Sequence, residues 1–277
     1  MSSRFLAFVF AAILSLHSMA GGESKDVVRI LAIGNSFSED AIDSYFSDIC
    51  KAAGKKVITG NMIIGGCPLS KHLLNARTDS ATYRFRRIGL NGTRITVDKV
   101  RPSEAIGSDD WDVVTFQQAS PLSGKYGSFV DLDSLMYYVK AMVRPDVRYM
   151  WHQTWAYAPG STHSAFPNYG SDQIAMYDSI VSASRRVVAD YPDLERVIPS
   201  GAAIQNARRM SGNADLTRDG YHLDYKIGRY IAACTWFEAI FGESVLDNTF
   251  VPAGLTESQA RLAREAAHAA CLSPFGE

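Results

Sequence analysis

Short apolar runs alternate along the chain with longer segments in which apolar residues recur at helical spacing. The runs read as strands cover residues 27–33, 56–64, 111–116, 147–151 and 197–198, the last being the start of a short strand. The segments with helical spacing cover residues 41–53, 132–143, 174–189, 227–240 and 258–270. Because repeated strand–helix alternation builds a parallel sheet covered on both faces, the pattern predicts a three-layer, doubly wound α/β fold.

Residues 81–99 interrupt this alternation. Apolar and polar positions alternate on both sides of Asn91-Gly92, and an Asn-Gly pair between two such runs is a strong hairpin signal. We expect this hairpin to be an insertion at the edge of a mostly parallel sheet. No repeat, low-complexity tract or Gly/Ser/Pro-rich linker divides the remainder, so residues 21–277 are predicted to form a single domain.

The first twenty residues are predicted to be a secretory signal peptide. An apolar run follows Arg4 and ends with small residues at Ser18 and Ala20. The run is short for a membrane span, although an uncleaved anchor helix is the alternative. The protein is therefore expected to be exported, to the periplasm or beyond the cell, and to have no membrane contact once residues 1–20 are removed.

Composition narrows the range of functions. The chain has 277 residues, 47% of them hydrophobic, and its 28 Lys and Arg against 29 Asp and Glu leave a net charge of −1. These values are typical of globular proteins, and the missing basic excess argues against nucleic acid as a partner. The four cysteines show no CxxC spacing, which gives a structural zinc site little support and leaves both disulfides and free thiols open.

The end of the first predicted strand carries a candidate nucleophile, Ser36, in the sequence Gly34-Asn35-Ser36. In open α/β sheets, ligands bind beyond the carboxyl ends of the strands, and the following helix N-terminus favours a developing negative charge. A serine there is suited to acyl transfer. The alternative is structural, because Ser36 and Glu39 also have the spacing of a helix capping box.

A candidate base lies near the other end of the chain, in Asp219-Gly220-Tyr221-His222. A nucleophilic serine needs a base within hydrogen-bond reach, and that base needs a third group to fix its tautomer. Asp219 and His222 can supply this pair on one turn. They could instead be a turn aspartate beside an exposed histidine, or metal ligands joined by His72, although no HExxH motif completes such a site.

Further candidates follow the ends of other predicted strands. Gly65-Gly66 could let a backbone N–H approach an oxyanion, and Gln117-Gln118 could donate from a carboxamide, although turn and strand-end roles are the alternatives. Possible substrate contacts come from histidines and from aromatic residues suited to sugar stacking, with core packing as the alternative. They are His72, Trp151, His152 and Trp155. Tyr126 and Tyr157 are further aromatic residues that could stack on a sugar. His163 and His268 are expected to be ordinary surface or packing residues.

Together these blocks resemble the SGNH (GDSL-type) hydrolase superfamily, in particular a subgroup of exported bacterial proteins with poorly defined substrates. The matching segments are ILAIGNSFSED, IIGGCPLS, WDVVTFQQAS and DGYHLD, the third of which has Gln where the superfamily usually has Asn. The resemblance implies a flavodoxin-like fold with Ser36 as nucleophile, His222 as base and Asp219 as its orienting partner. It also implies an oxyanion hole formed by Ser36, Gly66 and an amide of Gln118 or Gln117.

The leading hypothesis is therefore an exported serine esterase that works through an acyl-enzyme and removes acetyl or other acyl groups from carbohydrate. It would need no cofactor and no metal, and its partner would be a small-molecule or polysaccharide ester. One alternative is a glycan-binding protein that keeps the fold without catalysis, because fold alone does not establish activity. The other is a metal-dependent hydrolase using Asp219, His222 and His72.

Overall fold

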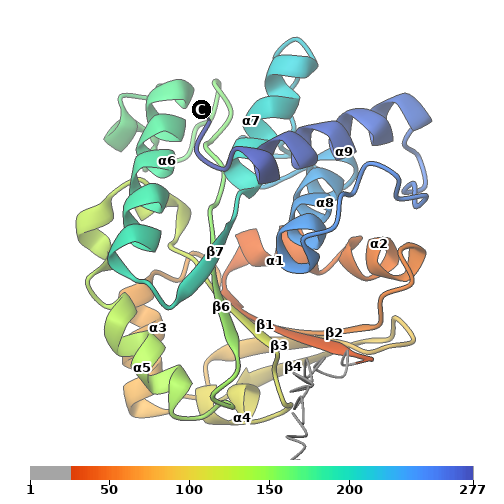
Figure 1. Ribbon diagram of the computed structural model, residues 1–277. Helices are drawn as coiled ribbons and strands as arrows, with labels where there is room; N and C mark the ends of the chain where they lie inside the picture. Colours follow the sequence, from red (N-terminus) through yellow and green to blue (C-terminus); the bar gives the residue numbers. More distant parts are fainter. Residues whose placement is uncertain (1–25, 277) are drawn as a thin grey trace, which may run out of the picture.

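The computed structural model describes residues 26–276, and within them one mixed sheet of seven strands forms the centre of the molecule (Figure 1). The strands are β1 (Val28–Gly34), β2 (Val57–Ile63), β3 (Tyr83–Ile88), β4 (Arg94–Val100), β5 (Val113–Phe116), β6 (Arg148–His152) and β7 (Leu194–Ile198). Their order across the sheet is β4-β3-β2-β1-β5-β6-β7. The predicted signal peptide lies outside the described residues.

The parallel part of the sheet has the order β2-β1-β5-β6-β7. Numbered along the chain, these strands run 2-1-3-4-5, which is the flavodoxin-like order. The hairpin of β3 and β4 turns at Asn91-Gly92 and adds antiparallel strands beside β2. The predictions of a doubly wound α/β fold and of an edge hairpin are both confirmed.

Helices cover both faces of this sheet (Figure 1). Helices α1, α2, α7, α8 and α9 pack together on one face, α3 and α5 pack on the other, and α6 lies beside β7 and α7. The bounds are α1 (Ser36–Ile42), α2 (Phe46–Ala52), α3 (Leu69–Thr78), α4 (Pro102–Ile106), α5 (Leu132–Lys140), α6 (Gln173–Asp190), α7 (Ser200–Met210), α8 (Ile227–Phe241) and α9 (Glu257–Leu272). Three short 3₁₀ turns, η1 (Ser120–Leu122), η2 (Tyr126–Phe129) and η3 (Phe166–Tyr169), lie in the loops.

Two features of the helices differ from the sequence expectation. The predicted helix over residues 41–53 is two helices, α1 and α2, because the chain leaves the helix at Asp43, whose side chain is bound by Arg86 and Asn61. Helices α3, α4 and α7 were not predicted. The buried face of α7 consists largely of small residues, which pack closely but give a weak hydrophobic signal in the sequence.

Helix α8 is the element that brings the two ends of the chain together. Gly228 and residues 230–240 of α8 are buried, and the helix packs against both α1 and α9. The loop that enters α8 carries His222, while α1 begins at Ser36. Packing α1 on α8 therefore places residues from opposite ends of the sequence at the carboxyl edge of the sheet.

The structure also bears on the cysteines and on membrane contact. Cys50, Cys67, Cys234 and Cys271 are free thiols, and only Cys271 is partly accessible. Burial raises the pKa of each of them, so they remain protonated at neutral pH. Between residues 26 and 276, no helix combines the length and the apolar character that a membrane span requires.

Candidate active site

Ser36 lies at the topological switch point of the sheet. It follows the end of β1, whose neighbours β2 and β5 are reached by connections on opposite faces. Such a point leaves a crevice beyond the carboxyl ends of the strands, where ligands of doubly wound proteins bind. Gly34 makes the turn possible, because a Cβ there would lie 2.4 Å from the Ser38 Oγ and 2.9 Å from the Gln117 Oε1.

Helix α1 is capped by Asn35 and not by Ser36. The Asn35 Oδ1 accepts from the Phe37 N–H at 2.9 Å and from the Gln117 amide at 2.9 Å, and its own amide donates to the Cys67 carbonyl. The capping-box interpretation of Ser36 is therefore wrong. With capping done by its neighbour, the Ser36 hydroxyl is left for another partner.

That partner is His222. The Ser36 Oγ lies 2.9 Å from His222 Nε2, and His222 Nδ1 lies 2.7 Å from the Asp219 Oδ2. An ionised Asp219 accepts from Nδ1–H, which leaves Nε2 to accept the serine proton. The structure thus brings all three predicted residues into the geometry of a Ser-His-Asp triad, across 186 positions of sequence between Ser36 and His222.

The turn that holds Asp219 also sets its charge. Its Oδ1 accepts from the backbone N–H groups of Tyr221 and His222, and Gly220 adopts a φ of +88° that few other residues tolerate. Burial raises the pKa of Asp219, but the hydrogen bonds from the His222 ring and from the two backbone N–H groups outweigh this effect. The net pKa lies below its ordinary value, so Asp219 is ionised at neutral pH.

A buried carboxylate ties the histidine loop to the serine helix. Asp40, four residues after Ser36 on α1, accepts from the Leu223 N–H at 2.9 Å, from Arg218 at 3.0 Å and from Arg229 at 2.6 Å. Arg218 also donates to the Leu223 carbonyl. Because Leu223 follows His222 directly, this network fixes the imidazole relative to Ser36.

The triad opens into a cleft of about 420 Å³, a size common among small-molecule sites. Its lining consists of Asn35, Ser36, Phe37, Gly65, Gly66, Ser120, Pro121, His163, Tyr221 and His222. Gly66 has a φ of +61°, and a Cβ on it would meet nothing within 4 Å. Within residues 26–276, the N–H groups of Ser36 and Gly66 have no hydrogen-bond acceptor, so both are available to a ligand.

The structure corrects the expectation that a glutamine completes the oxyanion hole. The Gln118 amide donates to the Ser128 carbonyl and hydroxyl, and its oxygen accepts from the Leu69 and Ala119 N–H groups. Gln117 donates to Asn35 and bonds His152 Nδ1. Neither residue lines the cleft. Both carboxamides bond to groups behind the cleft, which sequence cannot show.

The four proposed substrate contacts are also corrected. His72, Trp151, His152 and Trp155 are each at most 2% exposed, and none lines the cleft. His72 bonds the Tyr83 hydroxyl and His152 bonds Ser200, so both imidazoles serve packing. Trp155 acts behind the cleft, where it stacks on Phe37 at 4.4 Å and donates to the Tyr221 carbonyl.

Five residues that sequence reasoning did not place in the site do line it. They are Phe37, Ser120, Pro121, His163 and Tyr221. Phe37 and Tyr221 adjoin recognised motif residues and could have been proposed from that position alone. Ser120, Pro121 and His163 come from loops after β5 and β6, and only the sheet order shows that those loops reach the cleft.

The residues of the metal hypothesis do not assemble. His72 is buried against Tyr83, away from the cleft lined by His222. Among residues 26–276, no group of three or more His, Cys, Asp or Glu side chains converges as metal ligands would. Asp219 and His222 instead bond each other.

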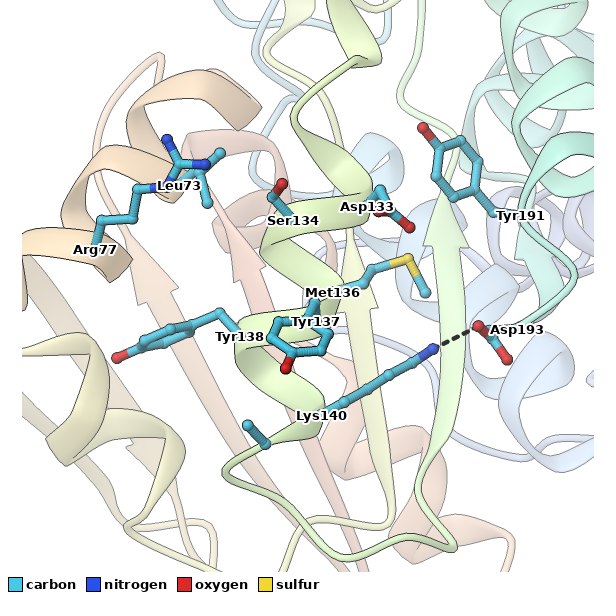
Figure 2. A pocket seen from close by; sticks show the side chains of 11 residues that line it. Leu73, Arg77, Asp133, Ser134, Met136, Tyr137, Tyr138, Lys140, Tyr191 and Asp193 are labelled. Atoms are coloured by element: carbon cyan, nitrogen blue, oxygen red, sulfur yellow. Dashed lines mark hydrogen bonds and ion pairs between the residues drawn. The ribbon is translucent and has the colours of Figure 1, made fainter.

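A second hollow of about 450 Å³ lies over α3 and α5 and shares no residue with the triad cleft (Figure 2). Figure 2 shows three tyrosines, Tyr137, Tyr138 and Tyr191, around it, with Lys140 paired to Asp193 at 2.5 Å. Its lining contains no histidine or cysteine that could act as a base or thiol nucleophile. Ser36 and His222 instead line the triad cleft of about 420 Å³.

Comparison with known proteins identifies structural relatives. A DUF4886 family protein from Bacteroides uniformis ATCC 8492 is 41% identical, with a TM-score of 0.88 over 90% of this chain and 96% of that chain. Two variants of Axe2 from Geobacillus stearothermophilus, described as an acetyl-xylooligosaccharide esterase and an acetylxylan esterase, are 13% and 12% identical. Each has a TM-score of 0.50; they cover 78% and 77% of this chain, and 95% and 94% of their own.

The Axe2 comparison shows a shared fold. A comparison with curated proteins gave no match. The family model described as domain of unknown function DUF4886 matches residues 29–270, nearly the whole of the described chain. The chain belongs to the DUF4886 family.

Proposed function

We propose that this protein is an exported serine esterase of the SGNH type that deacylates carbohydrate through an acyl-enzyme. One observation carries the proposal: the continuous hydrogen-bond chain from the Ser36 hydroxyl through His222 to an ionised Asp219. A serine, an imidazole and a carboxylate in this order make up the machinery of acyl transfer on several unrelated folds. The chain opens into a cleft that a small acyl group can enter.

The proposed mechanism follows from the positions of these groups. His222 Nε2 removes the hydroxyl proton as the Ser36 Oγ attacks the ester carbonyl, and the tetrahedral oxyanion accepts from the Ser36 and Gly66 N–H groups. His222 then gives the proton to the departing alcohol, leaving the acyl group on Ser36. Water, activated by the same imidazole, releases the acid. Asp219 holds the ring in the required tautomer throughout.

The substrate class is part of the proposal. The fold is shared with an esterase described as acting on acetylated xylan, and the cleft of about 420 Å³ suits a short acyl group. Export, which the first twenty residues suggest, would bring the enzyme to extracellular polysaccharide. No step of the proposed mechanism calls for a cofactor.

The proposal is tested by comparing Ser36→Ala with Ser38→Ala on a chromogenic acetyl ester and on acetylated xylooligosaccharide. We expect Ser36→Ala to lower kcat by about a thousandfold or more, because triad members act as a unit. Ser38 is a matched control: it lies on the same helix, and its hydroxyl bonds Asn35 and Asn61. Its loss should cost less than about tenfold.

Three outcomes would contradict the proposed serine esterase. Undiminished turnover by Ser36→Ala would exclude the serine mechanism, and loss of turnover on chelation would favour the metal-dependent alternative. Retention of glycan without any turnover by the unmodified protein would favour a glycan-binding protein on the same fold.

A further inference from the structure

His163 is a second histidine in the cleft, and the proposed mechanism leaves it unused. It lies in the loop between β6 and η3 and lines the same cleft as Ser36 and His222. Its ring packs 4.6 Å from the Tyr157 ring and 4.7 Å from the Tyr221 ring. Tyr221 in turn lies 4.3 Å from the His222 ring, so His163 belongs to the His222 side of the cleft.

The hydrogen bonding of His163 fixes which nitrogen carries the proton. Its Nδ1 accepts from the Ala165 N–H at 3.1 Å, and a neutral imidazole has one donor and one acceptor. The proton therefore sits on Nε2, which has no protein acceptor in the part of the chain that the structure describes. Burial, aided by the nearby His222, lowers the pKa of His163 against the opposing effect of Asp219, so the ring is neutral at neutral pH.

A neutral N–H donor beside His222 has a specific use in ester cleavage. His222 returns its proton to the departing alcohol, so the alcohol part of the ester must lie near that imidazole. A donor on this side can bind a second oxygen on the alcohol. Simple alkyl and aryl alcohols have no such oxygen, whereas a sugar has hydroxyl and ring oxygens adjacent to the ester.

We infer that the Nε2–H of His163 donates a hydrogen bond to an oxygen of the leaving sugar and thereby selects polyhydroxylated alcohols over simple ones. The inference rests on the proposed esterase function and assigns one residue to recognition of the alcohol. A site built to bind a hydroxyl discriminates against substrates that lack it, because its donor is then left unpaired.

The test compares kcat/KM for acetylated xylooligosaccharide with kcat/KM for p-nitrophenyl acetate, whose alcohol has no neighbouring hydroxyl. In His163→Phe, which keeps a ring against Tyr157 and Tyr221 but has no donor, we expect the ratio of sugar ester to aryl ester to fall about tenfold. His163→Gln presents an amide donor and should recover most of the ratio. Thr162→Ala, an exposed neighbour outside the cleft, is the matched loop control.

A purely structural role for His163 would lower both rates together and leave the ratio as in the unmodified protein, which would overturn the inference. An unaltered ratio with unaltered rates would overturn it equally. Failure of the proposed function looks different: the unmodified protein itself would then hydrolyse neither ester.

Discussion

At the scale of single residues, the site depends on which side chain hydrogen-bonds to the backbone N–H groups at the start of α1. Asn35 caps α1, binds Gln117 and reaches the Cys67 carbonyl, and this leaves the Ser36 hydroxyl to His222. The motif residues were predictable because the proposed acyl transfer requires a serine, a base and a carboxylate. The roles of Gln117 and Gln118 were not, since carboxamides suit an oxyanion hole and loop bracing equally well and only the tertiary contacts decide between them.

Gly34 offers a sharp test at this scale. In Gly34→Ala the new methyl would lie 2.4 Å from the Ser38 Oγ and 2.8 Å from its Cβ, in a packed region. We expect a loss of about 1–3 kcal/mol in the free energy of unfolding, measured by denaturant titration, because overpacking forces the backbone to shift. The shift displaces Ser36, so ester hydrolysis should fall as well. Gly127→Ala, whose methyl would meet nothing within 4 Å, should change neither quantity appreciably.

At the scale of elements, α1 and the loop before α8 are held together by a buried ion-pair network. Asp40 on α1 binds the Leu223 N–H, Arg218 and Arg229, and the Tyr225 ring lies within 5 Å of both guanidinium groups. Sequence periodicity identified α8 but could not reveal this brace. Its partners lie about 180 positions apart, and nothing local distinguishes Asp40 from a surface aspartate.

Replacing Asp40 with asparagine tests that brace. The change leaves two arginines without their buried counter-charge, so we expect about 3 kcal/mol of lost stability by denaturant titration. The loop that carries His222 loses its hydrogen bond to α1. In the folded variant, the fold-decrease in kcat should therefore be at least as large as the fold-change in KM. Asp193→Asn removes a surface partner of Lys140 by the same chemical substitution and should cost under about 1 kcal/mol. Equal effects of the two variants would contradict the assignment.

At the scale of the whole molecule, the alternation of apolar runs was enough to predict the sheet, its flavodoxin-like order being implied by the family resemblance. The pattern failed where burial is achieved by small residues, as in α7, or where a helix is broken by long-range ion pairs, as after α1. Among the buried titratable groups that have no role in the proposed mechanism are two histidines, His72 and His152. Burial lowers the pKa of each from 6.5 to about 3, with Lys71 adding to the effect at His72.

These two imidazoles predict how stability varies with pH. Below pH 6.5 the unfolded chain takes up a proton at each histidine that the folded protein does not, so stability is lost as the pH falls. At pH 5 each site costs about 2 kcal/mol relative to pH 8. His72→Gln removes one site, and its plot of unfolding free energy against pH between 6 and 4 should be shallower by about 1.4 kcal/mol per pH unit.

The comparison of slopes is insensitive to other groups. Burial raises the pKa of Asp43 to about 6, against the lowering effect of Arg86. This raised pKa makes the folded protein more stable as the pH falls, which is opposite to the effect of the histidines. Asp43 is present in both proteins, so its contribution is the same in both plots. Parallel plots for His72→Gln and the unmodified protein would show that His72 protonates in the folded state.

The claim on which the account depends is that Ser36 is a nucleophile activated by His222. The most direct measurement is labelling of the unmodified protein with a fluorophosphonate probe, followed by peptide mapping. We expect a single phosphonylated serine, Ser36, with no labelling in Ser36→Ala and much slower labelling in His222→Ala. Label on another serine, or undiminished labelling of Ser36→Ala, would contradict it.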